Sequence, residues 1–397
     1  MKIDPELSEE LSRLEKEGLY RRARVIEEQS LSHRIKIEGR EFLLFCSNNY
    51  LGLTHHPRVR EAAKEAIERF GTGSGASPLI SGTYRLHREL EEEIAAFKGV
   101  EAALLFPSGY AANTGIIPSL VGKGDLVLLD KLNHASLIDG AKLSGAGFRV
   151  YPHREVEALE EILLKERGYG RRLIVTDGVF SMDGDIAPLP EIAKLAERYD
   201  CLLMVDDAHA TGVIGQGGRG TASHFGLEDK IDIQMGTLSK ALAGAGGFAA
   251  GSKTLIEYLR NKARSYIYST ALPLGTAASA LAALRIIREQ PDIIERLWEN
   301  TNYFRQQLTG AGLNSGKSET PIIPLILGEV QATLKAAARL YQDGILVLPI
   351  RPPSVPRGKS RLRLTLMATH SKEDIDLVMG SLVSHKMGRL GNTRVPD

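Results

Sequence analysis

The chain has 397 residues, of which 43% are hydrophobic and 25% are charged, with 50 Lys plus Arg against 49 Asp plus Glu. This composition is typical of a globular protein with two or three domains. The formal net charge of +1 gives no electrostatic case for nucleic acid or an anionic membrane as the main partner.

The two cysteines, Cys46 and Cys201, lie far apart in apolar surroundings, so they predict neither a disulfide framework nor a zinc site. The first residues are charged and helical in pattern, which excludes the apolar core of a signal peptide. No run of about 18 apolar residues occurs that could span a membrane. We therefore expect a cytoplasmic protein.

The N-terminal part, residues 1–45, is expected to form a segment of its own. Leu7, Leu11 and Leu14 have helical spacing and predict a helix that ends near Gly18. The stretch HRIKIEGREFLLF (33–45) predicts a small hairpin, and residues 59–70 predict a helix. The following stretch GTGSGASPLISGTYR (71–85) is rich in Gly and Ser and predicts irregular backbone.

From residue 86 onward, helix-length segments alternate with short apolar runs rich in β-branched residues. This alternation predicts βαβ units, and hence an α/β domain over residues 46–285 with a mostly parallel sheet and helices on both faces. The predicted strands are AALLF (102–106), DLVLLD (125–130), RLIVTDGVF (172–180), CLLMVDD (201–207), IDIQMGTL (231–238) and GFAAG (247–251).

Residues 286–397 predict a small C-terminal α+β domain. A long helical stretch, 277–308 with an interruption near Pro291, leads into it. Its strand candidates are TPIIPLILG (320–328), ILVLPI (345–350) and RLRLTLMA (361–368), and its helices are 331–344 and 372–385. The last residues, 388–397, have no hydrophobic pattern and are expected to fray.

Polar residues follow the predicted strands at the points where ligands bind in open parallel sheets, beyond the carboxyl ends. Lys240 is the only charged residue between Ile233 and Ser252. A lysine in such surroundings is expected to be partly desolvated, which lowers its pKa and makes the amine a nucleophile. The other polar residues at strand ends are Ser108, Gly109, Tyr110, His134, Asp177, Ser181, Asp206, His209, Thr237 and Ser239.

Each of these features also has a plainer interpretation. Lys240 could extend from its loop into solvent, and His134 could be a histidine with a purely structural role. Asp206 and His209 could share a metal ion, but a second group of ligands is missing. Gly71–Gly75 follows a predicted helix and is a weak dinucleotide fingerprint, and no GxSxG nucleophile motif occurs.

Taken together, the strand ends supply what pyridoxal phosphate needs. A lysine can form a Schiff base, an aspartate can hold the protonated pyridine nitrogen, and a histidine can stack on the ring. Small hydroxyl-bearing residues nearby can bind the phosphate. We therefore predict a pyridoxal phosphate enzyme; a nicotinamide-dependent oxidoreductase or a catalytically silent interaction protein are the alternatives from other classes.

An ordered set of motifs resembles the α-oxoamine synthases, which are fold-type I pyridoxal phosphate enzymes. The match covers the chain except for about its last ten residues. The motifs are SNNYLGL (47–53), GTGSGASPLISGTYRLHRELE (71–91), SGYAAN (108–113), LNHASLIDG (132–140), DGVFSMDGDIAPL (177–189), VDDAHATGVIG (205–215), GTLSKALAGAGG (236–247), YIYST (266–270) and IRPPSVPRGKSRLRLTLMATH (350–370).

The resemblance assigns the catalytic roles. Lys240 would form the Schiff base with the cofactor, Asp206 would pair with the pyridinium nitrogen, and His209 would bond the phenolic oxygen of the ring. His134 would stack on the other face of the ring and touch the substrate. The remaining residues expected to bind the cofactor are Gly109, Tyr110, Ser181, Thr237, Ser239 and Thr270. Thr270 would reach the phosphate of the neighbouring subunit, so the resemblance implies a homodimer with shared sites.

The resemblance also implies the substrates. Asn48 and Arg363 would hold the carboxylate of the amino acid, Arg21 would meet the acyl substrate, and Ser354 would supply a hydroxyl. The closest motifs are those of members that condense L-alanine with pimeloyl-CoA, or its carrier-protein form, and release CO2 and the thiol in biotin synthesis. The alternative within the family is the reaction of glycine with acetyl-CoA. No metal is expected, and the role of Asp177 stays open.

Overall fold

The computed structural model describes residues 3–313, 315–385 and 387, and it divides into two compact units. The larger unit consists of residues 48–181 and 185–295, and the smaller unit of residues 1–47, 182–184 and 296–397. The domain boundaries expected after residues 45 and 285 stay predictions. The smaller unit combines both ends of the chain, because a strand near residue 345 pairs with one near residue 43.

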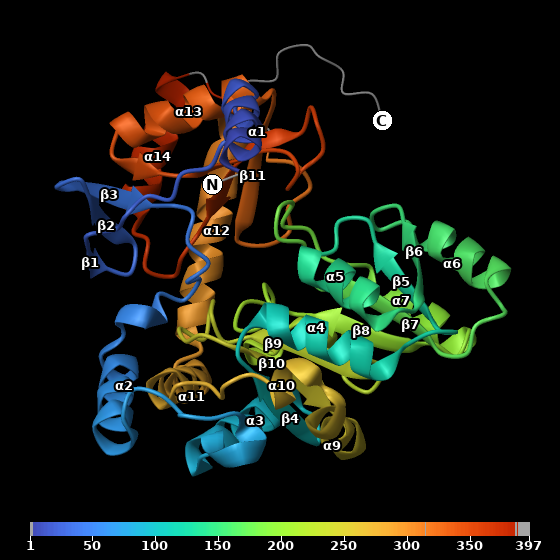
Figure 1. Ribbon diagram of the computed structural model, residues 1–397. Helices are drawn as coiled ribbons and strands as arrows, with labels where there is room; N and C mark the ends of the chain where they lie inside the picture. Colours follow the sequence, from blue (N-terminus) through green and yellow to red (C-terminus); the bar gives the residue numbers. More distant parts are fainter. Residues whose placement is uncertain (1–2, 314, 386, 388–397) are drawn as a thin grey trace. The chain divides into compact units, whose positions relative to one another are not determined.

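A seven-stranded sheet forms the larger unit, in the order β4-β10-β9-β8-β7-β5-β6 (Figure 1). All neighbours pair in parallel except β10, which is antiparallel to β4 and β9, so the predicted mostly parallel α/β sheet is confirmed. The strands are β4 (Ala102–Phe106), β5 (Leu126–Asp130), β6 (Gly147–Tyr151), β7 (Arg172–Asp177), β8 (Leu202–Asp206), β9 (Ile233–Thr237) and β10 (Gly247–Gly251). The sequence did not predict β6, because most of its residues are exposed at the sheet edge and form no apolar run.

Alternate residues of these strands enter two separate hydrophobic clusters. Val127 and Leu129 of β5 belong to one cluster, and Leu126 and Leu128 belong to the other. Since side chains alternate across a strand, the two clusters lie on opposite faces of the sheet. The first is covered by α4 (Gly109–Leu120), α5 (Ala135–Ser144), α9 (Lys253–Lys262) and α10 (Arg264–Ile267), and the second by α6 (Val156–Lys165), α7 (Leu189–Arg198) and α8 (Thr221–Phe225).

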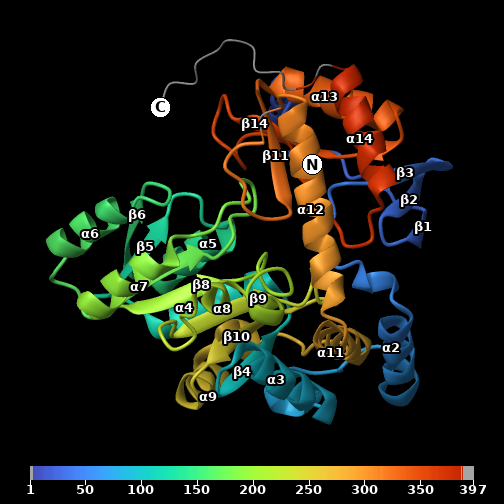
Figure 2. The same cartoon turned by 180° about the vertical axis from the view of Figure 1, so that it is seen from behind.

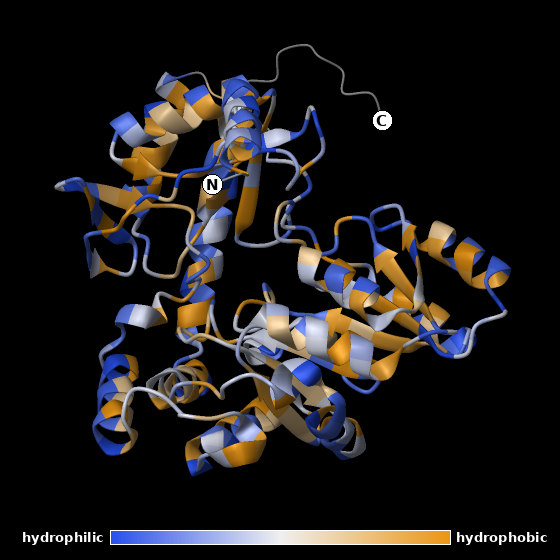
Figure 3. Ribbon diagram, in the orientation of Figure 1, coloured by the Kyte–Doolittle hydropathy of each residue, from blue (hydrophilic) through white to orange (hydrophobic). Residues whose placement is uncertain are grey.

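Figures 1 and 2 show these helices on both faces, and Figure 3 shows the hydrophobic colouring of the strands between them. The larger unit also contains α2 (Pro57–Phe70), α3 (Arg85–Lys98) and α11 (Leu274–Glu289), and α11 packs against the other two. Three short helical turns complete it: η1 (Leu53–His55), η2 (Pro78–Gly82) and η3 (Gln216–Gly218). Residues 71–84 are therefore irregular as predicted, except for the single π-helical turn η2, whereas Arg85 is the first residue of α3.

The smaller unit contains two sheets. The four-stranded sheet has the order β1-β2-β3-β12 and includes the predicted hairpin; its strands are β1 (Glu28–Leu31), β2 (Arg34–Ile37), β3 (Arg40–Leu44) and β12 (Ile345–Leu346). The three-stranded sheet has the order β11-β14-β13, with β11 (Ile322–Gly328), β14 (Ser360–Thr365) and β13 (Leu348–Ile350). The expectation of one strand over 345–350 is wrong, because β12 pairs with β3 whereas β13 pairs with β14.

The described helices of the smaller unit are α1 (Asp4–Lys16), α13 (Val330–Gln342), α14 (Lys372–Ser384) and most of α12 (Asp292–Gly310), whose residues up to Glu295 belong to the larger unit. The predicted interruption near Pro291 is confirmed, since α11 ends at Glu289 and α12 starts at Asp292. Within the described ranges, no helix is both long and apolar enough to cross a bilayer. Residues 388–397, where fraying is expected, lie outside the described residues.

Candidate active site

A cavity of about 260 Å³ lies in the larger unit, where the residues that follow several parallel strands meet. The structure brings together eight of the predicted site residues around it: Gly109, Tyr110, His134, Asp206, His209, Thr237, Ser239 and Lys240. Six further residues complete the lining: Ser108, Asn113, Ser136, Asp177, Ala208 and Met235. The rule of ligand binding at the carboxyl ends of strands therefore located the cavity from sequence.

Asp206 is the last residue of β8 and is 3% exposed. One carboxylate oxygen, Oδ1, accepts the backbone N–H of Ala208 at 2.8 Å, and the other, Oδ2, accepts the side-chain amide of Asn113 at 2.7 Å. Both donors are neutral. The carboxylate is thus held in place at the cavity, and it can stabilise a positive charge that enters there.

His209 lies on the same loop and is also buried. Its Nδ1 lies 2.7 Å from the hydroxyl of Tyr50, a residue that is 1% exposed and follows the motif SNN. Sequence reasoning missed Tyr50, because nothing in a lone tyrosine indicates which histidine it contacts. The hydrogen bond to Tyr50 helps to fix the orientation of the His209 ring at the cavity.

His134 caps the N-terminus of α5, and its backbone N–H donates to Asp177 Oδ2 at 2.7 Å. Its Nδ1 lies 2.7 Å from the hydroxyl of Ser136. Burial lowers the pKa of His134, and the nearby Lys240 lowers it further while Asp206 acts in the opposite direction. Burial therefore favours the neutral form of the imidazole.

Asp177 ends β7 and is paired in register with Asp206 on β8. Burial and the neighbouring Asp206 carboxylate raise the pKa of Asp177 well above its usual range. Two carboxylates at adjacent strand ends disfavour each other's charge, so the pair favours a proton on Asp177. The sequence left the role of this residue open, and the structure places it in the cavity lining.

The start of helix α4 forms the other side of the cavity. Ser108 caps this helix by accepting the N–H of Ala111 at 3.0 Å, and Thr237 Oγ1 lies 2.7 Å from Ser239 Oγ. A Cβ atom at Gly109 would lie 3.3 Å from Met235 Cε, so bare backbone fits closely there. Free N–H groups at a helix start and adjacent hydroxyls are suited to a phosphate.

Gly247 of β10 packs directly against the backbone of Ser108 and Gly109 at the start of α4. A Cβ there would lie 2.7 Å from both Ser108 O and Gly109 Cα, which is closer than real side chains approach backbone. The turn that carries the helix start is thus packed directly on β10. A side chain at residue 247 would displace it.

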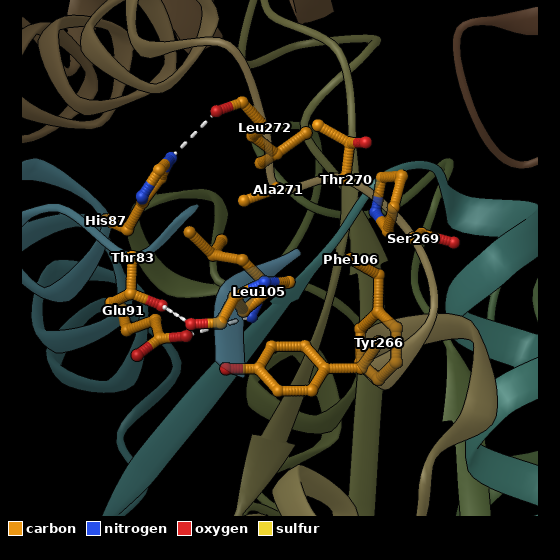
Figure 4. A pocket seen from close by; sticks show the side chains of 12 residues that line it. Thr83, His87, Glu91, Leu105, Phe106, Tyr266, Ser269, Thr270, Ala271 and Leu272 are labelled. Carbon is orange, nitrogen blue, oxygen red and sulfur yellow. Dashed lines mark hydrogen bonds between the residues drawn. The ribbon is translucent and has the colours of Figure 1, made fainter. Parts of the chain in front are cut away.

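Three predicted residues of the larger unit, Asn48, Ser181 and Thr270, do not line this cavity. Thr270 lines a much smaller one, of about 20 Å³, together with His87 and Glu91 (Figure 4). There His87 Nε2 lies 2.8 Å from Leu272 O, and Glu91 accepts the N–H of Leu105 at 3.2 Å. This second cavity has room for about one water molecule.

The remaining predicted residues, Arg21, Ser354 and Arg363, belong to the smaller unit. Arg21 Nη2 lies 3.4 Å from Ser354 Oγ, so the structure brings these two together. Arg363 is buried in β14 and donates from Nη1 to Thr365 Oγ1 at 2.9 Å. In the part of the chain that the structure describes, no group of three or more His, Cys, Asp or Glu side chains is placed to hold a metal ion.

Comparison with known proteins gives the family. The model for "Aminotransferase class I and II" matches residues 40–382, so the chain belongs to this family. An 8-amino-7-oxononanoate synthase of Geobacter sulfurreducens is 52% identical over 376 residues, which are 94% of this chain and 96% of that protein.

Two solved structures support the same assignment. A high-resolution structure of SPT with a PLP internal aldimine is 34% identical with a TM-score of 0.91, over 96% of this chain and 97% of that one. An 8-amino-7-oxononanoate synthase from Francisella tularensis is 29% identical with a TM-score of 0.75, over 87% of this chain and 98% of that one. The fold is that of the fold-type I pyridoxal phosphate transferases.

Proposed function

We propose that this chain is a pyridoxal phosphate-dependent acyltransferase that condenses L-alanine with a pimeloyl thioester to give 8-amino-7-oxononanoate, CO2 and the free thiol. The reaction would serve biotin biosynthesis. The observation that carries the proposal is the shared cavity of Lys240 and the buried carboxylate Asp206. The similarity to 8-amino-7-oxononanoate synthases over nearly the whole chain supports the substrates.

The residues of the cavity fit the cofactor. Asp206 offers a charged, buried carboxylate to a protonated pyridine nitrogen, and Lys240 offers an amine. The start of α4 at Gly109, with Thr237 and Ser239, offers N–H groups and hydroxyls to a phosphate. This cofactor requires, around one cavity, a carboxylate for its pyridinium, an amine for its aldehyde and a binding site for its phosphate.

When bound, pyridoxal phosphate draws electrons from the Cα of the amino acid and so makes its Cα–H acidic. Asp206 would keep the pyridine nitrogen protonated, and His209 would bond the ring oxygen. Lys240 would hold the cofactor through its amine. The same side chain, as a neutral amine, would accept the Cα proton of alanine.

The reaction forms one carbon–carbon bond and breaks two bonds, the carbon–sulfur bond of the thioester and the bond between the alanine Cα and its carboxyl group, while the released sulfur takes up a proton. The Cα of alanine bonds to the thioester carbonyl carbon while the carbon–sulfur bond breaks and the thiol leaves. The alanine carboxyl group then departs as CO2, and a proton returns to Cα. His134 would stack on the ring, and Gly109, Tyr110, Ser181, Thr237 and Ser239 would hold the cofactor.

The substrate-binding part of the proposal concerns the smaller unit and one loop. Arg363 and Asn48 would hold the alanine carboxylate, and the Arg363 guanidinium, oriented by Thr365, would do so bidentately. Arg21 and Ser354 would meet the acyl substrate, which their contact at 3.4 Å supports.

The chain would act as a homodimer with shared sites, in which Thr270 reaches the phosphate of the neighbouring subunit. Thr270 is exposed and does not line the cavity of its own chain. Near it, Ile80 of η2 and Tyr268 after α10 are 80% and 71% exposed, and η2 packs against α10. Apolar groups this exposed are suited to a subunit interface. We place the reaction in the cytoplasm.

Product identification tests the proposal. The purified holoenzyme is supplied with alanine plus pimeloyl-CoA, and in parallel with glycine plus acetyl-CoA. We expect 8-amino-7-oxononanoate and CoA from the first pair, at a rate well above that of the second pair. A higher rate with glycine and acetyl-CoA would replace this substrate assignment with the alternative one.

A further inference from the structure

A continuous chain of hydrogen bonds connects Asp206 with His134 through two residues that have no assigned role. Asn113 Nδ2 lies 2.7 Å from Asp206 Oδ2 and 2.9 Å from Ser136 Oγ. Ser136 Oγ lies 2.7 Å from His134 Nδ1. Asn113 and Ser136 are each 1% exposed, so water does not compete for these contacts.

The direction of each bond follows from the groups involved. An ionised carboxylate accepts and cannot donate, so the Asn113 amide must present its NH2 group to Asp206. The second N–H of the same NH2 group then donates to Ser136 Oγ. The amide oxygen of Asn113 is buried and finds no donor among the described residues.

The Ser136 hydroxyl has one hydrogen to give. Because its oxygen accepts from Asn113, that hydrogen is available to donate to His134 Nδ1. The backbone N–H of Ser136 also points at Nδ1, at 3.3 Å. Two donors directed at Nδ1 leave it as an acceptor, so the ring proton of the neutral imidazole must be on Nε2.

We propose that Asn113 and Ser136 are positioning residues that transmit the orientation of the Asp206 carboxylate to His134 and hold its imidazole as the Nε2–H tautomer. His134 then presents an N–H donor to the bound substrate, and its Nε2 cannot take a proton. The expected effect on turnover rests on the proposed function. The tautomer of His134 is independent of it.

The position of the two residues in the fold supports the assignment. Asn113 lies on α4 and Ser136 on α5, two helices that pack against each other on the same face of the sheet. A hydrogen bond between them could therefore serve packing alone. The deciding observation is the state of the His134 ring, which packing would not control.

The tautomer can be read by NMR. Protein labelled with 15N at histidine is recorded both as holoenzyme and without cofactor, and the His134 ring signals are assigned by their loss in His134→Gln. We expect a single Nε2–H tautomer at neutral pH in both forms. In Ser136→Ala and Asn113→Leu, we expect signals of both tautomers from His134 and unchanged signals from the other histidines.

Matched controls come from the same helices. Ser144→Ala removes a hydroxyl of α5 that bonds the backbone oxygen of Ala141, and Thr114→Ala removes one of α4 that bonds Tyr110 O. Both should keep the single Nε2–H tautomer. Ser136→Thr restores a hydroxyl and should restore the single tautomer. If the signals of the other histidines move in one of the two variants, Ser136→Ala or Asn113→Leu, its fold is disturbed and the other variant decides the test.

Turnover gives the second readout. With alanine, we expect kcat to fall about ten-fold in Ser136→Ala, as for the loss of one oriented hydrogen bond, while the KM for pimeloyl-CoA stays unchanged. An Nδ1–H tautomer in the wild type, or a single Nε2–H tautomer in both Ser136→Ala and Asn113→Leu, would overturn the inference. Failure of the proposed function would instead abolish product formation and leave the tautomer result intact.

Discussion

Asp206 and Asp207 are neighbours at the carboxyl end of β8, yet they belong to two regions of different chemistry. Asp207 is 1% exposed, and its Oδ2 forms an ion pair with Lys98 Nζ at 2.8 Å. Asp206 lines the cavity, where the donors that reach it within the described part of the chain, Asn113 and Ala208, are neutral. One carboxylate is already neutralised, and the other can still bind a cation.

The difference shows how partners decide the role of a buried charge. A buried ion pair such as Lys98–Asp207 stabilises the fold while both members are present, and breaking it leaves an uncompensated charge. A buried carboxylate held by neutral N–H groups keeps its charge at a fixed place, which is what a positively charged ligand needs. Substitutions should therefore separate the two regions, with turnover lost in one and stability lost in the other.

The largest expected effect concerns Lys240. In Lys240→Ala the proton acceptor and the covalent link to the cofactor are both lost, so turnover should fall by roughly 10⁴-fold or more. Borohydride reduction followed by peptide mass analysis should find the cofactor on residue 240 in the wild type and on no residue in the variant. Lys253→Ala, at an exposed lysine of α9, is the matched control and should keep both properties. Wild-type turnover in Lys240→Ala would remove this lysine from the mechanism.

The next effect tests the functional member of the aspartate pair. Asp206→Asn replaces the carboxylate with a neutral amide of the same size, which cannot stabilise a pyridinium, so turnover should fall by about 10³-fold. The free energy of unfolding should fall by about 1–3 kcal/mol, because the carboxylate accepts two hydrogen bonds, from Ala208 N–H and the Asn113 amide, and an asparagine can keep only one of them. Steady-state kinetics and urea unfolding measure the two quantities. A large loss of stability with normal turnover of the folded enzyme would reverse the assignment.

The sequence predicted most of the residues that the structure brings together around the larger cavity. Lys240, Asp206, His209 and His134 each follow an apolar strand, and strands of a parallel sheet bring their carboxyl ends together, so position in sequence determines position in space. Tyr50 follows no such strand, because it contacts His209 from a loop that precedes the seven-stranded sheet in sequence. Contacts of this kind depend on how a loop packs, and no periodicity encodes that.

In the smaller unit, the sequence did not predict how the strands pair. Residues 345–350 have the composition of one strand, but β12 and β13 pair in different sheets, because pairing partners lie hundreds of residues away in sequence or on the far side of a turn. Local pattern gives the strand type and not its partner. The pairing of β12 with β3 is also what joins the two ends of the chain in one unit.

The structural role of Asp207 is tested by substituting its ion-pair partner, Lys98. Lys98→Met removes a cation that is 0% exposed and leaves Asp207 charged and buried, so the free energy of unfolding should fall by about 3 kcal/mol. The double variant Lys98→Met with Asp207→Asn removes both charges, keeps an acceptor for the buried Thr221 N–H and hydroxyl, and should recover most of that loss. Urea unfolding measures the three proteins. Equal stability of wild type and Lys98→Met would show that the ion pair is not what stabilises this region.

A third group of buried carboxylates extends the comparison to pH and gives the smallest effect. His153 lies between Asp130 and Asp185, with Nδ1 at 2.9 Å from the first and Nε2 at 2.8 Å from the second. Burial opposes its charge, but the hydrogen bonds to both carboxylates outweigh burial and raise the pKa of His153 to about 9. Since the unfolded value is near 6.5, the stabilisation is complete below about pH 6.5 and is lost as the pH rises through about 9.

Over this range, the free energy of unfolding of the wild type should fall by about 2–3 kcal/mol relative to His153→Gln, as measured by urea unfolding at several pH values. His224→Gln should follow the wild type, and parallel curves for wild type and His153→Gln would show that His153 carries no such charge.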